Sequence, residues 1–147
     1  MSNHPPLLVT LLTLVVTAAC GGNSTTSPAS TSTTTTTVAS PTTTENFSAV
    51  LLVGGYSFYS FVVSQNGTVN VTLLSVAGAD VPATVTLGVA IGIPSGTGCT
   101  GGAVTNAAAG TDPQVTGTYS PGRYCVNISD IGNLAAPATF TVTIAHP

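Results

Sequence analysis

Three cysteines, Cys20, Cys99 and Cys125, are the residues of this sequence best suited to covalent chemistry. Cysteines of exported proteins pair as disulfides, so an odd count leaves one of them for another role. If Cys20 is modified, Cys99 and Cys125 remain as a pair, and a bridge between them would contribute on the order of 3 kcal/mol by restricting the unfolded chain. No metal site is expected, because two cysteines without a nearby histidine are too few ligands.

Cys20 follows an apolar N-terminal segment of the chain. An apolar run, Leu7 to Val16, is shorter than the roughly 20 residues that span a bilayer and ends in small residues, as secretory signals do. The segment Val16-Thr17-Ala18-Ala19-Cys20 resembles the bacterial lipobox, in which the cysteine is lipidated and becomes the first mature residue. We therefore predict a lipid such as palmitate on Cys20 and a location at the bacterial cell envelope, anchored to a membrane. The alternative is an ordinary secretory signal with an unmodified Cys20.

Charged side chains are scarce, and this excludes several classes of function. There is no lysine, and the charged residues are Glu45, Asp80, Asp112, Arg123 and Asp130. A nucleic-acid partner is not expected, because phosphate binding needs clustered lysine and arginine. Catalysis by a Ser-His-Asp group is not expected either, because the two histidines are His4, in the signal, and His146, after the last strand. We predict a protein that is not an enzyme and needs no cofactor.

Two binding alternatives remain open. The segment Asp130-Ile131-Gly132-Asn133 could present oxygens to calcium, although the same residues form ordinary turns. A glycan could stack on tyrosine rings, for which Tyr56 and Tyr59 are the candidates, whereas Tyr124 is expected in the core. These alternatives predict a glycan- or calcium-dependent binding module. A small hydrolase is a third, less favoured alternative.

The composition divides the chain into three segments. Residues 1–19 form the expected signal peptide, and residues 20–45 form a tether rich in Ser, Thr and Pro that lacks residues able to anchor a core. Residues 46–147 have strand patterns throughout, with turn residues at short intervals. We predict one folded domain in the third segment.

Alternating apolar residues predict an all-β domain, an antiparallel, jelly-roll-like β-sandwich of about seven or eight strands. The expected strands are Phe47 to Val53, Tyr56 to Val63, a strand from Thr68, Thr84 to Ile93, Gln114 to Thr118, a strand after the Ser120-Pro121-Gly122 turn, and Ala138 to Ala145. Gln65-Asn66-Gly67 is typical of a tight hairpin, because Asn-Gly tolerates positive φ angles. The second face of Thr84 to Ile93 is nearly smooth, which predicts a close neighbour such as the Gly-rich loop Ser95 to Gly102.

The domain resembles a known family of small exported β-sandwiches. The similar segments are Asn46 to Leu51 with Gly54-Gly55, Tyr59 to Val63, Gly67 to Leu73, and Ser120 to Val126. Together they are similar to the bacterial pre-peptidase C-terminal domain, which is appended to secreted proteases and other exported proteins. The chain departs from the family in carrying no peptidase, in placing a cysteine in the Gly-X-Tyr strand and in lacking an acidic cluster. The resemblance implies an exported β-sandwich, and the departures argue against metal binding and a proteolytic context.

The expected function is therefore that of a lipid-anchored, non-catalytic interaction or accessory module at the envelope surface, with an envelope protein or a glycan as partner. Weak self-association is a further expectation, because sandwiches normally protect their edge strands with Lys, Pro or bulges and this chain has no lysine. The strand Ala138 to Ala145, with Thr139, Thr141 and Thr143 outward, is the candidate edge. The alternative is a monomer whose edges are kept short by Gly and Pro breaks, including Pro82, Pro94 and Pro137.

Overall fold

The structure is a computed structural model that describes residues 37–147. This part of the chain forms nine strands and no helix, and it therefore contains no helix long and apolar enough to cross a membrane. The strands are β1 (Thr43–Leu51), β2 (Tyr56–Val63), β3 (Gly67–Ala77), β4 (Thr86–Ser95), β5 (Gly98–Thr100), β6 (Thr105–Ala108), β7 (Val115–Tyr119), β8 (Gly122–Ser129) and β9 (Ala138–His146). The predicted signal peptide, Cys20 and most of the tether lie outside the described residues.

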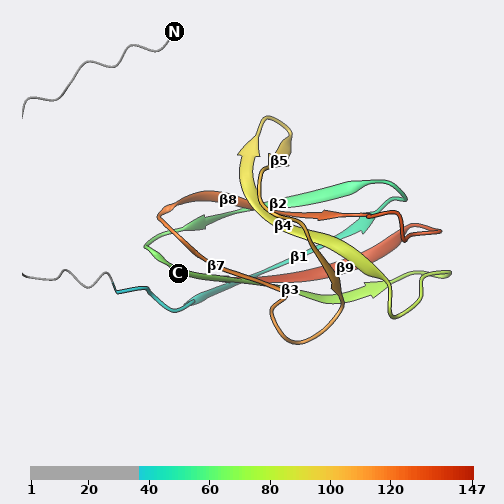
Figure 1. The fold of residues 1–147 in the computed structure, drawn as a ribbon, viewed down its shortest axis with the longest axis horizontal. Coiled ribbons are helices and arrows are strands. Elements are labelled where there is room, and N and C mark those ends of the chain that lie inside the picture. Colours follow the sequence, from blue (N-terminus) through green and yellow to red (C-terminus); the bar gives the residue numbers. More distant parts are fainter. Residues whose placement is uncertain (1–36) are drawn as a thin grey trace, which may run out of the picture. The chain divides into compact units, whose positions relative to one another are not determined.

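Two antiparallel sheets face each other (Figure 1). One has the order β1-β9-β3-β7, and the other has the order β2-β8-β4-β5, with β6 also paired to β4. Apart from the β4-β5-β6 segment, each strand is followed in the chain by a strand of the opposite sheet. This alternation is the arrangement of a jelly roll, so the predicted all-β sandwich is confirmed.

The core lies between the sheets and is built by the predicted alternation. Val69, Val71 and Leu73 of β3 are buried, as expected for one face of a strand. The inward residues of β9 and β8 are buried in the same cluster; they are Phe140, Val142, Ile144, Val126 and Ile128. The sequence therefore predicted the core face of these three strands correctly.

Tyr124 links the start of β8 to the core. Its ring lies edge-on to Tyr119, with ring centroids 5.0 Å apart, and its hydroxyl donates to the carbonyl oxygen of Ser120 at 3.1 Å. A tyrosine that bonds back to the backbone just upstream of its strand fixes the corner where the chain changes sheets. Tyr124 is half-buried and packs against the core, in agreement with its predicted position.

The predicted hairpin at Gln65-Asn66-Gly67 is wrong. β2 pairs with β8 and β3 pairs with β9 and β7, so the two strands flanking this turn lie in different sheets. A Cβ on Gly67 would lie 2.5 Å from the carbonyl oxygen of Ala39 and 2.4 Å from a side-chain atom of Pro147. The glycine thus serves close packing of three chain segments rather than a left-handed turn.

Ile93 belongs by alternation to the apolar face of the predicted strand Thr84 to Ile93, but its side chain is 63% exposed, so the pattern fails at this residue. β8 accompanies β4 only as far as Gly92, opposite Cys125, and beyond that point β4 pairs with β5. Figure 1 shows this end of β4 rising with β5 away from the two layers. The alternation continues past the point where β4 leaves the two layers, so it no longer means burial there.

The strand boundaries at the two ends of the domain differ from the predictions. β1 begins at Thr43 rather than in the segment after Asn46, so Glu45 belongs to a strand and not to the tether. Ala39 forms an isolated bridge with Gly67, which ties the chain down before β1. β9 lies between β1 and β3, so Thr141 is on the open face of a central strand and not on an edge.

Candidate binding surface

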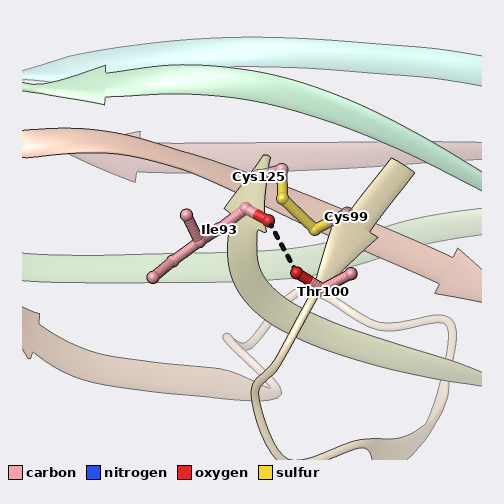
Figure 2. The surroundings of a disulfide bond; sticks show 4 residues. All are labelled: Ile93, Cys99, Thr100 and Cys125. Atoms are coloured by element: carbon pink, nitrogen blue, oxygen red, sulfur yellow. Dashed lines mark hydrogen bonds between the residues drawn. A yellow bond between two sulfur atoms is a disulfide. The ribbon is translucent and has the colours of Figure 1, made fainter. Parts of the chain in front are cut away.

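A disulfide fixes a loop on the outer face of the five-stranded sheet. Cys99 in β5 and Cys125 in β8 are bonded, with an S–S distance of 2.05 Å, and Cys125 is completely buried although its side chain points away from the core. Figure 2 shows the bond beside Thr100, whose hydroxyl donates to the carbonyl oxygen of Ile93 at 3.3 Å. The predicted pairing of Cys99 with Cys125 is thus present, and it pins the loop as expected.

The smooth face of β4 receives this loop. A Cβ on Gly92 would lie 2.5 Å from the carbonyl oxygen of Thr100, closer than real Cβ contacts allow. Gly102 has φ of +83°, and its Cβ would lie 2.0 Å from the carbonyl oxygen of Ile91. The small residues therefore admit the backbone of a close neighbour, as predicted, and no ligand is needed to account for them.

The two tyrosines considered for glycan stacking have different environments. Tyr56 is 63% exposed at the start of β2. Tyr59 points to the other face, where its ring stacks on Phe47 at a centroid distance of 5.4 Å and its hydroxyl donates to the Glu45 carboxylate. Only Tyr56 offers a free ring face, so a platform made of both tyrosines does not form.

Glu45 and His146 form a polar cluster that sequence reasoning missed. Nε2 of His146 lies 2.9 Å from Oε1 of Glu45, and Nδ1 lies 3.2 Å from the carbonyl oxygen of Pro147. The imidazole is buried, and its ring centroid is 5.2 Å from that of Phe61. Both ring nitrogens are engaged, and with the Tyr59 hydroxyl on Glu45 the cluster joins β1, β2 and β9.

The loop after β8 is organised by Asp130. Oδ1 accepts hydrogen bonds from the backbone N–H groups of Gly132, Asn133 and Leu134, and Oδ2 accepts one from Gly54 at 2.8 Å. The Gly54 N–H is the main cause that lowers the pKa of this carboxyl, the other three N–H groups lower it further, and desolvation opposes them. Both oxygens of this carboxylate are used to join two loops, and they are the oxygens that a calcium ion would need. Within residues 37–147, no group of three His, Cys, Asp or Glu side chains could hold a metal.

Replacing Asp130 with asparagine should destabilise the domain at neutral pH by about 1 to 2 kcal/mol, as for the loss of a capping carboxylate. The pKa of Asp130 is lower in the folded protein than the unfolded value of about 3.9, so its contribution is present above that value and is lost as the pH falls through the folded pKa. Urea unfolding at pH 7 and at stepwise lower pH values checks this. The difference in free energy of unfolding between wild type and Asp130→Asn should vanish in acid. Asp112→Asn, at an exposed side chain, should have the same free energy of unfolding as wild type at both pH values.

The only basic side chain lies beside a small pocket. The pocket has a volume of about 150 Å³ and is lined by Ser60, Phe61, Val62 and Arg123. Arg123 makes no salt bridge within residues 37–147, where the one pair within range joins His146 to Glu45. The guanidinium could hold a small anion there, but the pocket is smaller than the roughly 300 Å³ at which sites for larger ligands begin.

Apolar side chains are exposed around the connection from β1 to β2. Val50, Leu52, Val53 and Tyr56 are all more than half exposed, at 57%, 62%, 52% and 63%. Single exposed apolar residues are common, but several together on one part of a surface mark a site of protein or membrane contact.

Comparisons with known proteins leave the family open. No protein-family model matches the chain, and no curated protein sequence is significantly similar to it. The resemblance to the pre-peptidase C-terminal domain stays a prediction, carried by the segments from which it was made.

Proposed function

We propose that this protein is a lipid-anchored, exported β-sandwich that acts as a non-catalytic interaction or accessory module at the bacterial cell envelope. The observation that carries the proposal is the exposure of four apolar side chains that lie close together in the chain, Val50, Leu52, Val53 and Tyr56. Burying such side chains against a partner lowers the free energy of the system, because it removes apolar surface from water. The Glu45, Asp130 and His146 side chains are already engaged in bonds that stabilise the fold, which favours a structural over a catalytic role.

Export is supported by the disulfide. Bridges such as Cys99–Cys125 persist in oxidising compartments and are rare in reducing ones. A lipid on Cys20 would hold the domain at the membrane through the segment between Cys20 and Ala39, which has a fully extended reach of roughly 65 Å. The domain would then work at some distance from the headgroups.

Cells that express the protein and are fed an alkyne fatty acid should incorporate the label into the wild-type chain, because the small residues before Cys20 match a lipidation signal. Cys20→Ala should incorporate none. In-gel detection after coupling to a fluorophore measures the result, and Cys99→Ala serves as the matched control that should remain labelled. A wild-type chain without label, or equal labelling of Cys20→Ala, would contradict the anchor.

A glycan-binding module is the second candidate, and the exposed ring of Tyr56 favours it. Aromatic side chains that keep one polar end accessible are common at binding surfaces. A glycan array probed with wild type and Tyr56→Ala separates the candidates. Binding that disappears in Tyr56→Ala would favour the glycan module, whereas no binding by either protein would favour protein contacts. Calcium dependence has less support, because both oxygens of Asp130 already accept backbone hydrogen bonds.

A further inference from the structure

The edges of the two sheets are unequal. β1 and β2, which contact each other across one side of the sandwich, have nine and eight residues and pair with their inner neighbours over their whole length. On the other side β7 has five residues, while β5 and β6, with three and four, divide the edge of β4 between them. Long, regular edges are the ones that can accept another strand.

β2 lacks the devices that normally prevent such pairing. Its residues, Tyr56 to Val63, include no Lys, Pro, Gly or charged side chain, and its register with β8 has no bulge. Within residues 37–147 the backbone hydrogen bonds of β2 come from β8 alone. Every second N–H and C=O of β2 therefore faces away from the sheet without a partner in the fold.

We propose that β2 pairs antiparallel with β2 of a second copy of this chain, so that the two five-stranded sheets join across a two-fold axis at Tyr59. This register places Tyr56 opposite Val62 of the second copy, and Phe58 opposite Ser60. Tyr56 and Val62 are the most exposed apolar side chains of β2, at 63% and 53%, and both lie on the outer face. The strand is thus complementary to itself, as a two-fold interface requires.

The inference rests on the proposed function in one respect, which is the strength of association. A contact between two eight-residue strands buries less surface than a stable interface needs, so the dimer should be weak in dilute solution. Confinement to a membrane through the proposed lipid would raise the local concentration and favour it. No like charges oppose the contact along β2, because the strand has none.

The test uses the chain from residue 20 onward with Cys20→Ser, which removes both the lipid and stray intermolecular disulfides. Sedimentation equilibrium over a wide concentration range should show the wild-type mass rising from monomer toward dimer. In Tyr56→Glu/Val62→Glu, like charges face each other at both ends of the paired strands, which should weaken association about 10-fold or more. In Tyr56→Lys/Val62→Glu, opposite charges face each other, so association should stay within about 3-fold of wild type.

A matched control places the same charges on the other side of the sandwich. Thr116→Glu/Thr118→Glu changes two exposed positions of β7 and should leave association unchanged. Near-ultraviolet circular dichroism verifies that every variant is folded. A wild-type monomer at all concentrations, equal weakening by the β7 pair, or equal loss in both β2 variants would overturn the inference. Each of these results is independent of the fatty-acid labelling, so the anchor would stand or fall separately.

Discussion

Replacing Cys99 and Cys125 together with alanine should lower the free energy of unfolding by roughly 3.5 kcal/mol. The bond closes a loop with a sequence separation of 26 residues, and restricting the unfolded chain over that length gives a stabilisation of this size. The variant also loses the covalent bond that holds β5 against the outer face of β8. Urea unfolding of the wild type and of Cys99→Ala/Cys125→Ala, each without reductant, measures the difference.

The same bond can be removed without mutation, which provides the control. Wild type measured with reductant should approach the stability of the double variant, while the double variant itself should be insensitive to reductant. Intact mass after alkylation, with and without reduction, verifies the state of the thiols. Two alkylated thiols in non-reduced wild type, or a double variant as stable as wild type, would contradict this account of the loop.

Gly102→Ala should destabilise the domain by about 2 to 4 kcal/mol, because two separate costs add. The residue has a φ of +83°, which costs an L-amino acid about 1 to 2 kcal/mol. Its new Cβ would also lie 2.0 Å from the carbonyl oxygen of Ile91, so a backbone segment must move. Thermal or urea unfolding followed by circular dichroism measures the change.

Gly96→Ala is the matched control for that substitution. Gly96 also has a positive φ, of +56°, but nothing lies within 4 Å of the position of its Cβ. It should therefore show the backbone cost alone, about 1 kcal/mol. If the loop is held by the disulfide, the effect of Gly102→Ala should shrink in the background without Cys99 and Cys125, because a free loop can shift. Equal effects of the two glycine substitutions would show that the loop does not press on β4.

Alternation along the chain was sufficient to predict the class of the fold and the face of most strands. Alternation is a local property: a residue and the one two places on point to the same side of any strand, so Val69, Val71 and Leu73 could be assigned inward without knowing what they face. The same property placed Cys125 on the outside of its strand. Cys99 lies in the loop after the predicted strand Thr84 to Ile93. With Cys20 assigned to lipidation, the count of cysteines leaves Cys99 and Cys125 as the pair, and the structure contains that bond.

The tertiary structure alone decided which strands are neighbours. Asn66 and Gly67 have a hairpin sequence, yet β2 pairs with β8 while β3 pairs with β9 and β7, so pairing with distant segments outweighs the local turn preference. Ile93 continues the alternation of its strand, but it lies beyond the last residue of β4 that pairs with β8 and is exposed. The Glu45 to His146 contact joins residues 101 positions apart, and it exists because β1 pairs with β9. Pairing depends on apolar surface buried between distant segments, which no local pattern records.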